Sequence, residues 1–332
     1  MKRKGRTYIS TRFGRCPSAA LISQLSHLLT LAPAFLFSCS AETLPAEKPG
    51  KTQIYIHKTA KTTAGPLDLF FFNEDALLTL DAYQRFEPVT DAPLDGASRT
   101  GNKLIAGVMN LPGDIWAWSD INTFQRLSER MADLTEDSPG RPFMTGTARL
   151  CAGKDRQCTL ELTPLMSQIV LESLCFDFHA RPYRDLIAED IDIYLVNVNR
   201  TAALFDDGSA TLPASWLNMG GLDEGSVPAG HIDRADGTVF PGTVMYCYPN
   251  SATEDCLGRP LTRLVIEATL GGQRYWYPVN LRGIGRNQVL TLNITITRTG
   301  SSGPDIPTEA GTVQCEGSIV PWHSTTPQTI TF

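Results

Sequence analysis

Residues 289–298, VLTLNITITR, carry the clearest structural pattern in the sequence. Apolar and polar side chains alternate without a break over this stretch. Because successive side chains of a β-strand point to opposite faces of its sheet, this period of two predicts a strand with one buried and one solvent-facing side. The predicted buried face comprises Leu290, Leu292, Ile294 and Ile296, and the predicted outer face comprises Thr291, Asn293, Thr295 and Thr297.

Similar patterns recur along the chain, so strands are expected to dominate it. Residues 52–57 and 190–199 each predict a strand, and residues 67–73 predict one that is apolar on both faces. In residues 261–270 the inward face is expected to hold Leu264, Ile266, Ala268 and Leu270, with Arg263, Glu267 and Thr269 outside. Many short strands between Gly, Pro, Asn and Asp turns predict an all-β chain built of sandwiches.

One segment has helical spacing instead. Within residues 122–134, Phe124, Leu127, Met131 and Leu134 fall on one stripe of a helix. Asn122 or Thr123 could cap its start. We therefore expect one short helical crossover, which would cover the edge of a sandwich.

Composition and charge limit the classes of function. The chain has 332 residues, of which 42% are hydrophobic and 19% charged, as in globular proteins. Its length allows two domains, which we place at residues 51–160 and 161–332. The net charge of −6 gives no reason to expect a polyanion as partner, so nucleic acid is not predicted to bind.

The N-terminus has the pattern of an export signal. Basic residues precede a mostly apolar run over residues 19–37, which ends in Leu36, Phe37, Ser38 and Cys39. This ending resembles the lipobox of bacterial lipoproteins, whose cysteine carries acyl chains such as palmitate. The resemblance implies a lipoprotein signal peptide over residues 1–39, a lipidated Cys39 and a polar tether over residues 40–50. The alternative is a plain secretory peptide with a coincidental cysteine.

Six cysteines remain after Cys16 and Cys39, and an even number in an exported protein favours disulfides. Cys151 and Cys158 flank one short polar loop, and Cys247 and Cys256 flank another, so each pair could form a bridge. Cys175 and Cys315 could pair with each other or stay as buried free thiols. Their spacing does not fit a zinc site, and no metal or other cofactor is predicted.

No stretch of the sequence carries a catalytic motif. A nucleophile elbow, a phosphate loop and a zinc-protease motif are all missing, so we do not predict an enzyme. Trp116 and Trp118, in residues 114–120, alternate on one strand face and could stack on sugars as a glycan platform. The competing interpretation places both in the hydrophobic core.

Several stretches in order resemble the fimbrial subunits of Bacteroidales, namely the fimbrillins of type V pili and their minor and anchor subunits. The stretches are GPLDLFFFNEDALLTLDAYQRF at 65–86, NKLIAGVMNLP at 102–112, RPFMTGTARL at 141–150, LTPLMSQIVLESL at 162–174, GIGRNQVLTLNITITRTGSSGPD at 283–305 and VQCEGSIVPW at 313–322. In the fifth stretch, Leu290 stands where the family usually has tyrosine. The resemblance covers residues 66–332.

This resemblance implies a fold and a mode of assembly. The fold would be two transthyretin-like Greek-key β-sandwich domains in an outer-membrane lipoprotein. Subunits of this family join by strand exchange: a protease cuts after an arginine near the first strand, and the C-terminal strand of another subunit fills the opened groove. The donor residues here would be Val313, Cys315, Ile319, Trp322, Ile330 and Phe332.

One departure from the family pattern points to a particular role. No arginine lies between Cys39 and Tyr83, and the first ones after the lipid site are Arg85 and Arg99. Without an earlier cut, residues 51–57 and the lipid would stay attached. We therefore expect a lipid-tethered anchor or minor subunit of the fimbrium, which gives a strand to other fimbrial subunits rather than receiving one.

Two further expectations complete this interpretation. Residues 300–310 are rich in Gly, Ser and Pro, and we expect them to let the C-terminal strand swing between its own domain and a neighbour. The alternative function is an outer-membrane surface lipoprotein that binds a glycan or a protein of a host or bacterial surface.

Overall fold

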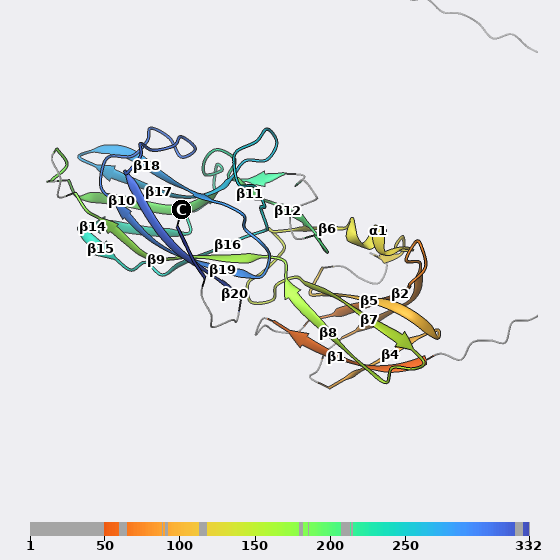
Figure 1. Ribbon diagram of the computed structural model, residues 1–332. Helices are drawn as coiled ribbons and strands as arrows, with labels where there is room; N and C mark the ends of the chain where they lie inside the picture. The colour runs from red at the N-terminus through yellow and green to blue at the C-terminus, as the bar shows by residue number, and fades with distance from the viewer. Residues whose placement is uncertain are drawn as a thin grey trace, which may run out of the picture. The chain divides into compact units, whose positions relative to one another are not determined.

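The computed structural model describes residues 50–59, 65–87, 89, 92–112, 118–178, 182–184, 186–206, 213, 215–322 and 328–331 (Figure 1). Nearly all of its regular structure is β-strand, which confirms the predicted all-β class. By its contacts, Glu47–Phe332 forms one compact unit. The predicted signal peptide, including Cys39, lies outside the described residues, as does the predicted tether except for its last residue, Gly50, which begins the first strand.

The first sheet has seven strands in the order β3-β2-β5-β7-β8-β1-β4. β7 and β8 pair only over Met144–Thr145 and Thr163–Pro164, so the sheet divides there into two halves. The strands are β1 (Gly50–Lys58), β2 (Leu67–Asn73), β3 (Leu80–Phe86), β4 (Leu94–Ser98), β5 (Gly101–Met109), β7 (Met144–Ala152) and β8 (Gln157–Pro164).

The two halves of this sheet enclose one hydrophobic core. Ile54 of β1, Leu94 of β4 and Leu160 of β8 meet Leu69 of β2 and Ile105 of β5 in it. A sheet that folds over itself in this way is a β-sandwich, because the inner faces of both halves are buried against each other.

β2 is buried on both faces, as its sequence predicts. Leu67, Leu69 and Phe71 lie in the sandwich core. Phe70 and Phe72 point to the opposite face and belong to a second cluster with residues of the following helical segment. This interior strand therefore contributes to two cores.

The remaining long strands form two further sheets. One has the order β14-β10-β17-β18, and the other β15-β9-β19-β20-β21 with β16 also paired to β9. Their bounds are β9 (Ser167–Phe176), β10 (Ala188–Val196), β14 (Gly230–Ala235), β15 (Gly237–Val239), β16 (Thr243–Cys247), β17 (Thr262–Leu270), β18 (Gln273–Leu281), β19 (Gln288–Ile296), β20 (Val313–Pro321) and β21 (Gln328–Thr331). The change from the first sheet falls at residues 165–166, a few residues beyond the predicted boundary at 160–161, which lies inside β8.

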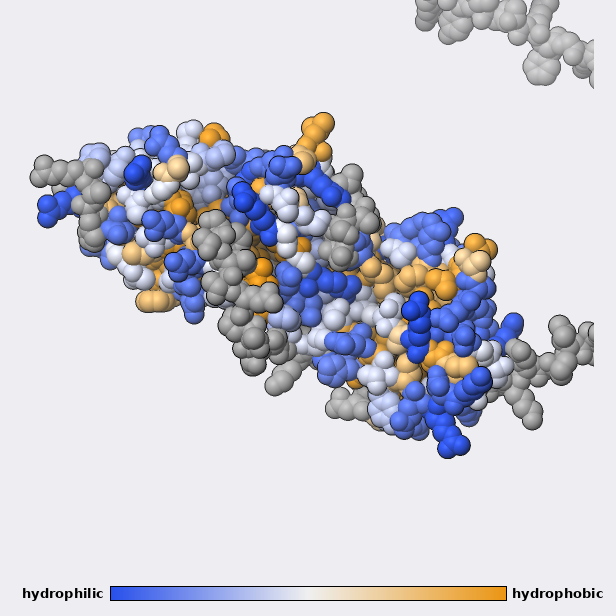
Figure 2. Space-filling model, viewed as in Figure 1, coloured by the Kyte–Doolittle hydropathy of each residue, from blue (hydrophilic) through white to orange (hydrophobic). Residues whose placement is uncertain are grey.

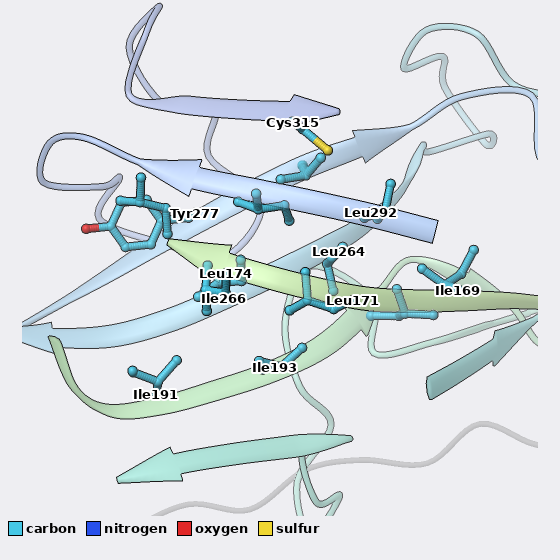
Figure 3. Packing of buried hydrophobic residues seen from close by; sticks show 14 of the residues in the cluster. Ile169, Leu171, Leu174, Ile191, Ile193, Leu264, Ile266, Tyr277, Leu292 and Cys315 are labelled. Carbon is cyan, nitrogen blue, oxygen red and sulfur yellow. The ribbon is translucent and has the colours of Figure 1, made fainter. Parts of the chain in front are cut away.

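These two sheets pack face to face over the largest core. Figure 3 shows Ile169, Leu171 and Leu174 of β9 in the same layer of side chains as Ile191 and Ile193 of β10. The opening stretch behaves as predicted, since Leu290, Leu292, Ile294 and Ile296 of β19 are all buried in this core. The predicted inward residues of β17 are buried there as well.

The predicted helix is shorter than its apolar stripe. α1 (Phe124–Ser128) begins where expected, and the Thr123 side chain accepts a hydrogen bond from the Arg126 amide as its N-cap. The prediction that Met131 continues the helix is wrong, because β6 (Met131–Asp133) pairs with β12 (Thr201–Ala203). Pairing with a distant segment thus ends the helix. A second short antiparallel pair is formed by β11 (Val198–Asn199) and β13 (Trp216–Leu217).

Arg263 of β17 departs from the predicted outward position. Its side chain is buried and forms ion pairs with Asp255 and Asp305. Its Nε also donates to Asn280 Oδ1 over 2.8 Å. Two carboxylates, from the loop before β17 and from the loop between β19 and β20, therefore compensate the burial of this charge.

The visible surface is mainly hydrophilic, with apolar residues between the polar ones (Figure 2). The most exposed large apolar side chains lie in turns and loops outside the strands: Leu77, Met219, Val227, Phe240 and Leu257. Scattered residues of this kind are normal on soluble surfaces. Within the described residues, no helix is long and apolar enough to span a membrane.

Candidate functional site

The first strand is held on both sides. β1 pairs in parallel with β8, with Gln53 opposite Gln157 and Lys58 opposite Leu162. It pairs antiparallel with β4 on its other edge, with Gly50 opposite Ser98. β1 is thus an interior strand of its half-sheet, although it stands at the start of the described chain.

Side chains of β1 fill the sandwich core. Ile54 is fully buried in the first core. Thr52, two residues earlier in β1, is also buried. Gly96 of β4 leaves room for Ile54, because a Cβ at Gly96 would lie 2.6 Å from Ile54 Cδ1. The Thr52 hydroxyl donates to the Asp155 carbonyl over 3.1 Å. Removal of β1 would therefore expose a groove with apolar seats and two unpaired strand edges.

Unlike β1, the last strands of the chain lie at the margin of their sheet. β20 pairs antiparallel with β19 over its whole length, from Val313 opposite Ile296 to Pro321 opposite Gln288. β21 pairs with only the middle of β20, from Glu316 to Ile319. Among the described residues, β21 is the terminal strand of its sheet and is paired on one edge only.

The predicted donor residues share one strand but not one environment. Cys315 is buried in the largest core, and Val313 and Ile319 pack against it. The Trp322 ring stacks on Tyr246 at a centroid distance of 6.1 Å. Ile330 is in β21, opposite Gly317, and Phe332 lies outside the described residues. β20 and β21 are thus paired within their own sheet. This is the docked state, which the sequence left open as the alternative to strand exchange.

The segment expected to act as a hinge is fastened to the sheet. Ser301 and Trp276 exchange backbone hydrogen bonds of 2.9 and 3.2 Å. Asp305 pairs with Arg263 and accepts from Asn197 Nδ2 over 3.0 Å. Thr312 is buried, and its carbonyl accepts from the Thr297 amide over 3.0 Å. In this conformation residues 300–310 are fastened, so the expected swing of β20 would require these contacts to break, whereas release of β21 would not.

The predicted glycan platform is not found at Trp118. This side chain is 7% exposed and its ring meets Phe70 edge-on at 5.3 Å in the second core. A buried indole cannot offer its face to a sugar, so the competing core interpretation holds for Trp118. Trp116 lies outside the described residues.

The predicted disulfides are not formed in the structure, where the six cysteines after Cys39 are free. Cys247 is fully buried at the end of β16, whereas Cys256 is exposed in a turn, so the two thiols lie in different environments. Cys151 and Cys158 lie in β7 and β8, where the two strands have separated. Burial raises the pKa of the Cys315 thiol to about 12, which keeps it protonated and unreactive.

The two arginines singled out by the sequence differ in accessibility. Arg85 lies within β3, is 20% exposed and pairs with the buried Asp68 over 3.1 Å. Arg99 lies between β4 and β5 and is 74% exposed. The described residues contain no cluster of three or more His, Cys, Asp or Glu that could hold a metal ion.

A contact that the sequence analysis missed fixes the loop before β19. Arg286 donates to the Thr163 carbonyl over 2.7 Å and to Thr145 Oγ1 over 2.9 Å. It thereby joins the β19 loop to the point where β7 and β8 diverge. The resemblance placed Arg286 in a motif, but its partners lie more than a hundred residues away in the sequence.

Comparison with known proteins gives a clear result for structures only. Neither a family model nor a curated protein matches the chain. Solved structures do match: a candidate cell adhesion protein from Bacteroides eggerthii aligns at 15% identity with a TM-score of 0.61, over 83% of this chain and 96% of that one. A fimbrilin from Porphyromonas gingivalis aligns at 12% identity and a TM-score of 0.60, over 83% of this chain and 98% of that one.

The chain has the fold of a fimbrial subunit. The tip fimbrial protein Mfa3 from Porphyromonas gingivalis, with a C-terminal truncation, is also similar, at 11% identity and a TM-score of 0.52. It is matched over its whole length and over 83% of this chain. The family resemblance stated from the sequence is thus confirmed by structures of fimbrial proteins, at the level of the fold.

Proposed function

We propose that this chain is a non-enzymatic structural subunit of a fimbrium on the bacterial surface, where it joins other fimbrial subunits by strand exchange. The fold similarity to fimbrial proteins supports the structural role. The contrast between the two ends supports the direction of exchange. β1 occupies its own groove with both edges paired, whereas β21 is a four-residue terminal strand paired on one edge. Such a strand is available for donation to a neighbour.

Within this proposal, the chain is the lipid-tethered anchor or another minor subunit. Arg85 is too enclosed in β3 to meet a protease, and a cut after Arg99 would remove β1 to β4 together. The loss of β2 alone would destroy two cores. An uncut chain keeps β1 in place and, with an acylated Cys39, stays in the outer membrane.

We expect mass spectrometry of the mature surface protein to find an acylated cysteine at position 39 as its first residue. Cys39→Ser should leave the chain without lipid and release it, with any attached fimbriae, into the medium. A mature protein that begins at Phe86 or Thr100 would contradict the anchor role while leaving strand exchange intact. The N-terminal peptide, measured on protein from cells, distinguishes these results.

The strand-exchange proposal predicts that removal of residues 323–332 abolishes incorporation into fimbriae. The fold itself should remain, because β20 keeps its full ladder to β19 without β21. The thermal unfolding midpoint of the purified monomer is therefore expected to change little. Copurification with the next subunit and electron microscopy of the cells measure assembly.

A full-length variant with residues 328–332 in scrambled order is the matched control, since it keeps length and composition. It should fail to assemble as the truncation does, because a donor strand must place its side chains in the right register. Normal fimbriae from both variants would contradict the proposed donation by this segment. The alternative function is binding of a glycan or host protein. Trp118 is buried and cannot serve as its platform, so this function stays a prediction without a site.

A further inference from the structure

Three adjacent strands bring a lysine, an asparagine and an aspartate together at one end of the first sandwich. Lys103 of β5 lies directly opposite Asn73 of β2 in the ladder. The Lys103 side chain is 2% exposed, and its Nζ lies 2.5 Å from Asn73 Oδ1 and 3.0 Å from Asp81 Oδ2. On its other side, Lys103 pairs with Leu150 of β7, whose side chain is in the core.

A β-bulge directs Asp81 of β3 into this group. Phe71 pairs with Ala82 and Phe72 pairs with Leu80, so Asp81 is an extra residue in the ladder. Bulges of this kind redirect a side chain and recur at functional sites. The Asp81 side chain is only 1% exposed.

The oxygens of Asp81 are unequally satisfied. Oδ2 accepts a hydrogen bond of 2.8 Å from the Arg99 amide, in addition to the contact with Lys103. Oδ1 is buried and accepts no hydrogen bond in the described structure, although the Arg99 Nε lies 3.5 Å away. A proton on Oδ1 would have no hydrogen-bond donor to displace.

Lys103 and Asp81 face each other with almost no exposure to water, and a charged pair is costly to bury. One proton passed from Nζ to a carboxylate oxygen would remove both charges and leave a nucleophilic amine. Because the fold holds it against the Asn73 carboxamide, the reaction gains the large effective concentration of an intramolecular step.

We propose that Lys103 and Asn73 form an intramolecular amide cross-link between β5 and β2, with Asp81 as the proton-transfer group. The neutral Nζ attacks Asn73 Cγ and forms the new C–N bond, while protonated Asp81 gives its proton to the carboxamide oxygen. Asp81 then takes a proton from Nζ and delivers it to Nδ2. The C–Nδ2 bond breaks, the oxygen returns its proton to Asp81, and one ammonia leaves. No oxidant, reductant or other reactant is required.

The two ends of the Asn73 carboxamide have different partners. Its oxygen faces Lys103, and its Nδ2 donates to Thr79 Oγ1 over 3.3 Å. The Thr79 hydroxyl in turn donates to Asp75, in the exposed turn between β2 and β3. The leaving nitrogen thus lies on the side of the turn, from which ammonia can reach solvent.

Intact mass spectrometry of the folded, purified mature chain tests the proposal. We expect a mass lower by one ammonia than its sequence requires, and a tryptic digest that contains one branched peptide joining Asn73 to Lys103. A succinimide at Asn73 would lose the same ammonia but leave the two peptides separate, and that result would overturn the proposal. A folded chain with its full mass would also overturn it, and the three side chains would then form only a buried ion pair.

Variants separate the roles of the groups. Lys103→Arg keeps a positive charge but lacks the amine, so its full mass and separate peptides are expected. Asp81→Asn keeps the shape but cannot shuttle the proton, and it too should keep the full mass. Lys58→Arg, at the half-buried end of β1, is the matched control and should remain cross-linked. If Lys103→Arg or Asp81→Asn fails to fold, the mass of the wild-type chain still decides whether the cross-link forms.

Discussion

A chain that lacks β1 is expected to lose the stable fold of its first sandwich. Replacement of Ile54 by alanine alone should cost about 2–5 kcal/mol of unfolding free energy, as for other fully buried aliphatic side chains. Deletion of residues 1–64 removes this side chain, buried Thr52 and the ladders to β4 and β8 together. The combined loss is comparable with the whole stability of a domain, about 5–15 kcal/mol.

The missing strand should be replaceable from outside. A synthetic peptide with the sequence of Gly50–Lys58 is expected to bind the shortened chain and to restore its unfolding transition, with a midpoint that rises with the logarithm of peptide concentration. Circular dichroism during thermal unfolding, with and without peptide, gives the measurement. The same peptide with Ile54→Asp is the control and should not bind, because a carboxylate would have to enter the apolar seat above Gly96.

The opposite result would also be informative. If the shortened chain unfolds at the same temperature as the full chain and ignores the peptide, β1 is dispensable and no groove depends on it. The proposed role as an uncut anchor would then lose its physical basis, since retention of β1 would protect nothing. Donation of the C-terminal strand does not depend on this outcome.

Local sequence patterns predicted the strands well wherever one face meets a core. The alternation over residues 289–296 and the two apolar faces of β2 both reappear in the structure. Their side chains keep the period of two even though the β19–β9 and β2–β3 ladders each shift register once, because a buried face strongly specifies which side chains point to it. The N-cap at Thr123 was predictable for the same reason, since its partner lies three residues away.

Features that depend on distant residues could not be predicted in this way. The alternating pattern places Arg263 on the outer face of its strand. Its burial depends on Asp255 and Asp305, which pair with it from two loops. The helix ends early because Thr201–Ala203 takes Met131–Asp133 into a ladder. The fastening of residues 300–310 likewise rests on Trp276 and Arg263, and composition alone suggested the opposite.

The group around Lys103 shows what signal the sequence did carry. Residues 101–109 alternate between the two cores, and a lysine stands at an inward position of that pattern. A buried lysine needs partners, so this position could have been flagged. Asp81 could not have been assigned to it, because only the bulge in β3 turns its side chain inward.

Asp137 is expected to make the stability of the chain fall as the pH rises from about 4 to 7. Its Oδ1 accepts from the Phe143 amide over 2.8 Å, and its Oδ2 accepts from the Tyr248 hydroxyl over 3.1 Å. Burial outweighs these hydrogen bonds and raises the pKa of Asp137 to about 7, from its usual 3.8. Phe143 and Tyr248 both belong to the second core, so the carboxyl group lies at its margin.

The direction follows from proton binding in the two states. Between pH 3.8 and 7 the folded chain holds a proton on Asp137 that the unfolded chain has lost. The stabilisation is therefore complete below the unfolded pKa, declines through this interval and is gone above the folded pKa. After allowance for partial exposure of the side chain, we expect the change to be about 2 kcal/mol.

Asp137→Asn isolates this contribution, since the amide is neutral at every pH and can still accept from Phe143 and donate to Tyr248. Denaturant unfolding should find the variant equal to the wild type near pH 4 and more stable near pH 8 by that amount. The quantity to compare is the difference in unfolding free energy between the two proteins at each pH. Burial also raises the pKa of Asp68, so both proteins share a pH dependence that this difference removes.

Asp133→Asn is the matched control, on a neighbouring carboxylate with the opposite shift. Partial burial opposes ionisation of Asp133, but hydrogen bonds from Thr135 and Arg200 outweigh it and lower its pKa. Its stabilisation is present above the unfolded pKa and lost as the pH falls, so this variant should be less stable than the wild type near neutral pH. Equal pH profiles for the wild type and Asp137→Asn would show that Asp137 ionises normally in the fold, and that its contacts with Phe143 and Tyr248 do not depend on its proton.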